Sequence, residues 1–313
     1  MESAIASIVL ASAPLVYAVI GETITEKAGV INLSLDGSIM LSAMAGFAVA
    51  FTTGSTTLGF LVAGIVGMLV ALVIAYASIT LTLNQVAVGF VMFALTRDLS
   101  TFLGNPYVHQ PLAGVPHLPI PGLAKIPFIG PILFDQDLMV YGSIVLIFVS
   151  YWFIFRTRPG LKLQAVGERP EGAHSRGIPV NRLRYLYTAI GGLLVGFGGA
   201  AFSLDVKLGW SYQHTLNFGW IALAIVIFGG WHPYRAAVGA YLFGTLQIVA
   251  IELQTVLPTL SQILPSLPFP IMILTLVVVY TDWLKQLANR FPSLREFLAS
   301  EPPTASGTRF QPE

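Results

Sequence analysis

The sequence contains no cysteine, and only 10% of its 313 residues are charged. Without cysteine, the chain can form no disulfide, no thiolate metal site and no cysteine nucleophile. Charged residues make up about 25% of soluble proteins, so their scarcity indicates that most of this chain faces lipid or other buried segments. The formal net charge of +1 lacks the basic excess of nucleic-acid-binding domains, so we expect no nucleic acid among its partners.

Motifs for catalysis and nucleotide binding are missing as well. The five histidines form neither an HExxH nor an HxxxH pair, no GK[ST] sequence completes a Walker A loop, and GxSxG does not occur. We therefore predict that the chain is not an enzyme and carries no catalytic residue, no metal site and no cofactor.

Long apolar runs are what the sequence has instead. Hydrophobic residues make up 55% of the chain, and its mean hydropathy is +0.76. Because a helix needs roughly 20 apolar residues to cross the membrane, we predict an all-α polytopic membrane protein with about eight to ten hydrophobic segments. They are 4–20, 31–53, 58–83, 85–103, 138–155, 185–206, 215–230, 236–256 and 264–282. Segment 215–230 could be a half-span or a full span.

A basic loop at 156–184 sets the predicted orientation. It holds seven of the sixteen Lys and Arg residues and lies between the uncharged segments 138–155 and 185–204. Cytoplasmic loops of membrane proteins carry an excess of Lys and Arg, so we place this loop in the cytoplasm. The path then puts thirteen of the sixteen basic residues and the C-terminus inside, with the N-terminus and 104–137 outside. This pattern predicts a multi-pass protein of the plasma (inner) membrane, in contact with membrane lipid.

Two stretches outside the spans have a distinct composition. Residues 104–137 contain seven prolines, and because proline restricts the backbone we expect an ordered loop on the outer face. We assign 1–297 to the transmembrane domain. Residues 298–313 are rich in Pro, Ser and Thr, so we expect a disordered tail there.

Small residues recur at every fourth position in three segments, a spacing that lets helix backbones approach closely in lipid. The three sets are Ala63, Gly67, Ala71 and Ala75; Gly192, Gly196 and Ala200; and Ala236, Ala240 and Gly244. We expect these faces to pack against helices of the same chain rather than to form a dimer seam.

Polar side chains inside membrane segments are costly and mark candidate functional sites. Asn32 and Asp36 are four residues apart and share a helix face, although Asp36 could also be a solvated cap. Asn84 and Gln85 open the fourth segment, where Asn84 could be an N-cap instead. The remaining candidates for a substrate pathway are Arg97, Asp98 and Asn217.

Four stretches resemble one family of transporters. They are GVINLSLDGSIMLSAMAGF at 29–47, LTLNQVAVGFVMFAL at 81–95, RTRPGLKLQAVGERPEGAHSRGIPVNRLRYLYTAIGGLLVGFGGAAFSL at 156–204 and GWIALAIVIFGGWHPYRAAVGAYLFG at 219–244. They are similar to membrane permease subunits of ABC importers in the ribose, branched-chain amino-acid and nucleoside group, and closest to the nucleoside permeases. The resemblance implies a type II-like ABC importer transmembrane domain. The nucleoside branch usually has Glu where this chain has Asp36, which keeps the residue acidic but shortens it.

The resemblance also implies a function and partners. It implies a permease subunit that takes up nucleosides, driven by a separate ATPase subunit. A second permease chain, homologous or identical, and an extracytoplasmic substrate-binding protein or lipoprotein would complete the transporter. The alternatives are an ABC permease for a simple sugar or a branched-chain amino acid, or an ion-coupled secondary transporter. An intramembrane enzyme would need clustered polar groups, whereas the acids inside the predicted spans are scattered: Asp36, Asp98, Asp205, Glu252 and Asp282.

Within this family, the basic loop corresponds to the coupling helix that docks into the ATPase subunit. Pro170 suits the first turn of a helix, and Glu168 and Glu171 favour its N-terminal end. Gly177 followed by Pro179 would end the helix. The predicted coupling residues are Gly167, Glu168, Arg169, Pro170, Glu171, Ala173 and Gly177.

Overall fold

A computed structural model describes residues 2–212, 215, 217–257, 259, 263–266, 268–281 and 302–311. Over these residues helices dominate and extended backbone pairs only in isolated bridges, so the predicted all-α class is confirmed. Seven helices in the described chain are long and apolar enough to span a membrane. They are α1 (Glu2–Lys27), α2 (Leu35–Thr53), α3 (Thr56–Ala75), α4 (Gln85–Gly104), α5 (Leu138–Arg156), α8 (Val180–Ala201) and α10 (Pro233–Val256). The shorter helices are α6 (Arg158–Glu168), α7 (Pro170–His174), α9 (Phe218–Phe228) and α11 (Pro268–Tyr280).

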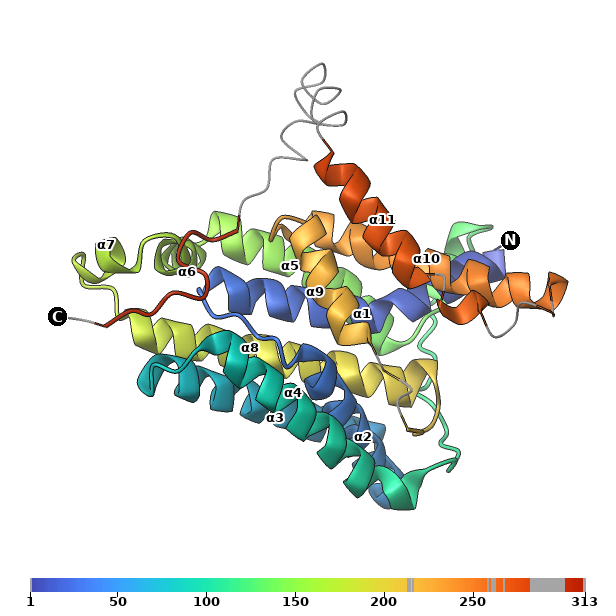
Figure 1. Ribbon diagram of the computed structural model, residues 1–313. Coiled ribbons are helices and arrows are strands. Elements are labelled where there is room, and N and C mark those ends of the chain that lie inside the picture. The colour runs from blue at the N-terminus through green and yellow to red at the C-terminus, as the bar shows by residue number, and fades with distance from the viewer. Residues whose placement is uncertain are drawn as a thin grey trace.

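The long helices lie side by side, with α1 near the middle of the bundle (Figure 1). α1 contacts α8, α10 and α5, and α8 in turn packs against α3 and α2. Helices α6 and α7 lie at one end of the bundle, whereas the N-terminus and the 104–137 loop lie at the other. Following the charge distribution, we call these the cytoplasmic end and the outer end.

Small residues bring the backbones of neighbouring helices into contact. A Cβ added to Gly67 of α3 would collide with Gly192 and Gly196 of α8, and one added to Gly244 of α10 would collide with Ser12 of α1. In lipid, such close approach drives helix association through van der Waals packing. The predicted small-residue faces therefore pack within the chain.

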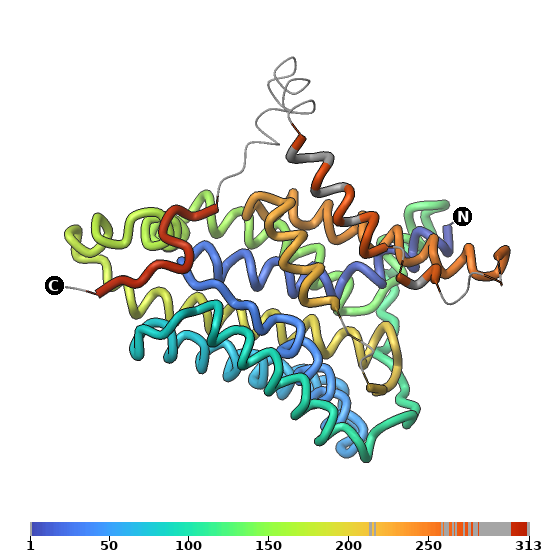
Figure 2. Tube along the Cα trace, in the orientation of Figure 1, coloured from blue at the N-terminus to red at the C-terminus, as the bar shows by residue number. Residues whose placement is uncertain are grey.

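Two helices begin inside the bundle rather than at its ends (Figure 2). α9 has 11 residues and is about 16 Å long, because each residue adds 1.5 Å. It is therefore too short to cross roughly 30 Å of hydrocarbon, and segment 215–230 is a half-span preceded by the non-helical residues 207–212 and 217. α2 likewise starts at Leu35, after the non-helical stretch 28–34.

The first helix is longer than the sequence predicts. We expected the span to end at residue 20, but α1 continues to Lys27 and encloses Glu22 and Glu26. Both carboxylates accept hydrogen bonds from within the protein, Glu22 from the backbone N–H of Asn32 and Glu26 from the indole N–H of Trp231. Because these contacts replace solvent, the helix can stay buried across two acidic residues.

The tail also differs from the expected disorder. Residues 302–311 pack against the cytoplasmic ends of α1, α6, α7 and α8, and Ala305 and Phe310 are buried. Backbone hydrogen bonds and these two apolar side chains give the segment the contacts that its composition does not reveal. Residues 298–301, 312 and 313 lie outside the described part of the chain.

The 104–137 loop is held together by backbone hydrogen bonds. His109 N–H donates to the carbonyl of Trp210 (3.1 Å), and Ile120 N–H donates to the carbonyl of Phe134 (2.9 Å). The first bond joins the loop to the segment that follows α8, and the second closes the loop on itself. The two segments thus lie together at the outer end.

The absence of native cysteine allows a direct test of orientation. His117 and Ser175 are both exposed, one at each end of the bundle, whereas Ala173 is buried in α7 and unsuited to labelling. An impermeant thiol reagent added to intact cells should label a His117→Cys variant and leave a Ser175→Cys variant unlabelled until the cells are opened. Labelling in the reverse order would contradict the assigned orientation.

Candidate functional site

At the cytoplasmic end, α6 and α7 form a helical hairpin. α6 is set by its own sequence: the Thr157 hydroxyl accepts a hydrogen bond from Gly160 N–H (3.1 Å), and Pro159 occupies the first turn. This helix is absent from the sequence prediction, although an N-cap Thr followed by Pro is a recognisable start signal. α7 then begins at Pro170, as predicted, and its chain turns back at Gly177, whose φ is +78°.

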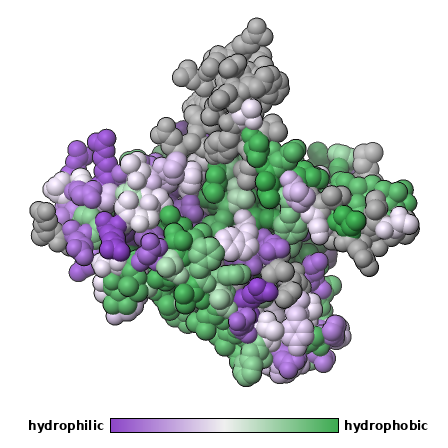
Figure 3. All heavy atoms as spheres, in the orientation of Figure 1, coloured by the Kyte–Doolittle hydropathy of each residue, from purple (hydrophilic) through white to green (hydrophobic). Residues whose placement is uncertain are grey.

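The seven predicted coupling residues divide into two groups. Gly167, Pro170 and Ala173 are buried and hold the hairpin against the bundle. The others are exposed: Glu168 and Arg169 where α6 joins α7, and Glu171 and Gly177 farther along the chain. Figure 3 shows hydrophilic residues gathered over this end, whereas hydrophobic residues cover much of the middle. The hairpin therefore presents a polar, rigidly anchored tip to the cytoplasm.

The second candidate site lies where α2 and α9 begin inside the bundle. Asp36 in the first turn of α2 accepts a hydrogen bond from the backbone N–H of Gly219, in the first turn of α9 (2.9 Å). A helix N-terminus exposes unpaired N–H groups and carries partial positive charge, so a carboxylate there stabilises both helices. Gly219 has no alternative, because a Cβ there would collide with the backbone of Asp36.

The non-helical stretch before α2 is fixed by the predicted polar residues. Gln85 at the start of α4 accepts a hydrogen bond from Ile31 N–H (2.9 Å), and Asn32 accepts bonds from the N–H and hydroxyl of Ser34 (3.1 and 2.7 Å). Asn32 and Gln85 are buried. In this structure, they bind backbone and leave little surface for other contacts.

The other predicted pathway residues differ in their relation to Asp36. Arg97 is half-buried, and its charge acts on the Asp36 carboxylate. Asn217 is exposed immediately before α9, and its backbone N–H faces the Asp36 carboxylate. Asn84 instead caps α4, because its side chain accepts a hydrogen bond from Ala87 N–H (3.1 Å). Asp98 is exposed on α4.

Aromatic rings missed by the sequence analysis lie beside these polar groups. The Trp220 ring lies 5.9 Å from the Phe90 ring and 5.5 Å from the Phe93 ring, measured between centroids. Phe90, Phe93 and Arg97 follow helical spacing along one face of α4. The combination of a guanidinium, an exposed amide and an aromatic surface can bind a polar molecule that has an apolar face.

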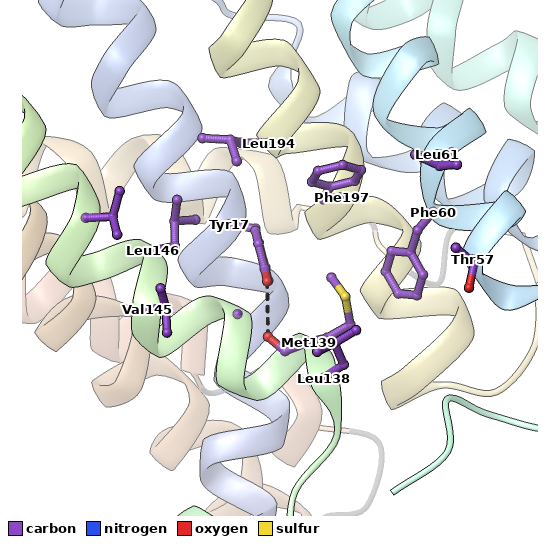
Figure 4. A pocket seen from close by; sticks show the side chains of 12 residues that line it. Tyr17, Thr57, Phe60, Leu61, Leu138, Met139, Val145, Leu146, Leu194 and Phe197 are labelled. Atoms are coloured by element: carbon purple, nitrogen blue, oxygen red, sulfur yellow. Dashed lines mark hydrogen bonds between the residues drawn. The ribbon is translucent and has the colours of Figure 1, made fainter. Parts of the chain in front are cut away.

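A groove lined by apolar side chains lies elsewhere in the bundle. It has a volume of about 430 Å³ and lies between α1, α3, α5 and α8. Figure 4 shows Tyr17 donating its hydroxyl to the carbonyl of Met139 (3.2 Å) among apolar side chains. A hydrophilic substrate would find few partners there, so we do not assign this groove to substrate.

The turn between α9 and α10 lies beside the cytoplasmic end of α5. The ring of His232 stacks on Phe155 of α5, with centroids 5.0 Å apart. Burial, together with the charges of Arg235 and Lys27, lowers the pKa of His232 to about 4. At neutral pH this imidazole is uncharged.

Residues 4–276 match the family described as branched-chain amino acid transport system / permease component, and the chain belongs to this family. It is 39% identical over 251 residues to the "Putative glucose ABC transporter permease protein TsgC13" of Haloferax volcanii, covering 79% of this chain and 76% of that protein. It is 29% identical over 288 residues to the nucleoside ABC transporter permease protein NupC of Lactococcus lactis, covering 88% and 91%. It is 30% identical over 266 residues to the guanosine ABC transporter permease protein NupQ of Bacillus subtilis, covering 80% and 82%. No solved structure matches the chain.

The family and the seven candidate membrane-spanning helices together identify a multi-pass ABC transporter permease.

The His232 environment makes a prediction about pH. Between about pH 6.5 and 4 an unfolded chain binds a proton at this histidine, while the folded chain does not. Stability should therefore rise with pH across this window and be lost as pH falls through it. His232→Phe keeps the stacked ring and removes the titration, so its thermal midpoint in detergent should fall less than that of the parent chain between pH 7 and 4.5. Identical pH profiles for the two proteins would contradict the assignment.

Proposed function

We propose that this permease imports nucleosides as one half of a translocation path, powered by a separate ATPase subunit that docks on α7. The observation that carries the coupling role is the exposed α7 tip on a buried base, at the basic end of the bundle. A coupling helix needs an exposed surface to bind the ATPase and a buried base to hold it in position, because a loosely held loop would move without displacing the other helices.

The substrate path in this proposal runs past the start of α9. Transporters commonly bind substrate near mid-membrane at helices that begin there, because free backbone groups and helix N-termini are available. Here the exposed Asn217 and the half-buried Arg97 would form hydrogen bonds to hydroxyl or base atoms. The ring of Trp220 would contact the flat face of the base or sugar.

The proposal includes two further partners. α4 is the least buried of the long helices, and it exposes large apolar side chains beside the aromatic cluster: Val86, Phe90, Val91, Leu95, Leu99 and Phe102. A second permease chain packing on this face would enclose the path. An extracytoplasmic binding protein would dock on the outer surface made by 104–137 and 207–212.

A simple sugar is the second candidate substrate. TsgC13, the relative at 39% identity, is named as a putative glucose permease, whereas the two nucleoside relatives are about ten percentage points lower in identity. Both substrate classes carry a hydroxylated ring, so the polar groups near α9 suit either. The aromatic surface favours nucleosides, because a base adds a second flat face for stacking.

Reconstitution with the cognate ATPase and binding protein in liposomes tests the proposal. ATP-dependent uptake of labelled adenosine or guanosine, not competed by excess glucose, is the expected result. Uptake of glucose without nucleoside would replace the substrate and keep the coupling role. Failure of the ATPase to co-purify with the intact chain would refute the coupling role itself.

Charge reversal at the α7 tip should weaken docking. Glu171 is exposed and its carboxylate makes no hydrogen bond among the described contacts, so Glu171→Arg should reduce ATPase co-purification about tenfold, equivalent to ~1.4 kcal/mol. Asp135→Arg is the matched control, because it reverses an exposed acid at the outer end. Equal loss in both variants, or no loss in either, would contradict docking at α7.

Removing the aromatic and amide groups near α9 should slow uptake without disturbing assembly. Trp220→Ala and Asn217→Ala should each lower ATP-dependent nucleoside uptake by about tenfold, if each loses one good contact, while Trp220→Phe should retain most of it. Thr245→Val is the control, since the Thr245 hydroxyl bonds only to a carbonyl of its own helix among the described contacts (Tyr241, 2.8 Å). Normal uptake by both alanine variants would move the path elsewhere.

A further inference from the structure

The C-terminal segment 302–311 crosses the base of the coupling hairpin. Thr304 donates both its hydroxyl and its backbone N–H to the Glu168 carboxylate (2.8 and 3.2 Å). Ala305 N–H donates to the carbonyl of Gly167 (2.9 Å). These bonds join the segment to the last residues of α6, directly before α7.

The same segment is bonded to α8 and to the residues that follow α1. Gly307 N–H donates to the carbonyl of Gly29, just after α1 (3.2 Å), and the carbonyl of Thr308 accepts a bond from the Arg184 guanidinium in α8 (3.1 Å). Arg184 is 2% exposed. Because a buried guanidinium without a hydrogen-bond partner is costly, the bond to Thr308 favours the docked segment.

Phe310 completes the contact on the α7 side. It is 7% exposed and lies in a small cluster with Val166, Ala173 and Val180. Its ring meets the His174 ring edge-on, with centroids 5.5 Å apart. Burial of this aromatic side chain removes apolar surface from water, which helps to keep the short segment in place.

We propose that residues 302–311 act as a clip that makes α7 move as one unit with α1 and α8. The proposal rests on ATPase docking at α7. α7 itself has five residues and is joined to α8 by a turn at Gly177, where an added Cβ would meet nothing within 4 Å. The clip adds a second connection beside this turn, because it is bonded on one side to Glu168 and Gly167 and on the other to Gly29 and Arg184.

A clip and a docking surface would fail in different ways. Without the clip, α7 would still present its exposed residues to the ATPase, but its displacement would no longer reach α1 and α8. ATP hydrolysis would then continue without transport. Thr304, Ala305 and Phe310 are therefore positioning residues, which act through the coupling helix rather than on the substrate.

The test compares the reconstituted transporter with three variants of the permease. They are a chain ending at residue 301, the double substitution Thr304→Val with Phe310→Ala, and Ser306→Ala as the control, whose side chain makes no described hydrogen bond. ATPase co-purification, ATP hydrolysis and nucleoside uptake are measured on each preparation, with the thermal midpoint to verify folding.

The clip predicts normal co-purification and continuing hydrolysis in the first two variants, with uptake reduced at least fivefold, so that more ATP is used per molecule imported. Thr304→Ser with Phe310→Leu should restore the wild-type ratio. An unchanged ratio in the first two variants would overturn the proposal, as would loss of ATPase co-purification in them, since the segment would then act in docking. Failure of the intact chain to bind the ATPase would instead refute the proposed function.

Discussion

The need to satisfy backbone N–H groups inside the membrane governs this structure. Two helices, α2 and α9, begin within the bundle, and each start leaves backbone donors that cost several kcal/mol apiece if they are buried unpaired. Asp36 meets this need for α9, and Gln85 and Glu22 meet it for the stretch before α2. Asn32 and Asp36 of the NLSLDG sequence therefore serve as hydrogen-bond acceptors for backbone N–H groups.

The same constraint links the two candidate sites. Gly29, at one end of the stretch before α2, is bonded to the clip at the cytoplasmic end, and Asp36, just past its other end, is bonded to the start of α9. The six residues between them, 30–35, therefore connect the base of the coupling hairpin to the centre of the bundle. A displacement of α7 that carries α1 and α8 with it would reach the start of α9 along this connection, and α9 carries the Trp220 surface.

Much of the fold could be predicted from the sequence because lipid imposes simple patterns. Apolar length predicted the long helices, small-residue spacing predicted close packing within the chain, and Pro170 with Gly177 predicted a short helix where α7 lies. The half-span α9 and the extension of α1 through Glu22 and Glu26 depend on tertiary partners such as Trp231, which lies more than two hundred residues away from Glu26 in sequence. For the same reason, composition assigned the tail to disorder, although Thr304 and Phe310 find partners on α6 and α7.

In the candidate pathway, too, some residues could be predicted from the sequence and others depend on tertiary contacts. The sequence identified Asp36, Arg97 and Asn217, which the fold brings together, but it could not separate them from Asn84, which caps α4. The aromatic face of α4 was missed because aromatic residues are common on lipid-facing helices, and only the neighbouring polar groups distinguish this one. Ala94 is exposed on that face, between Phe90 and Arg97 at helical spacing.

The central claim is that the substrate path runs between the start of α9 and the aromatic face of α4. Its most direct test is the chemical accessibility of Ala94→Cys in the assembled transporter. If this face of α4 lines a water-filled path, a charged thiol reagent should modify the cysteine, and saturating nucleoside should slow the reaction. Val145→Cys, in the apolar groove of Figure 4, should react only with a lipid-soluble maleimide. Reaction of Ala94→Cys with the maleimide but not with the charged reagent would show that α4 faces lipid and would contradict the account.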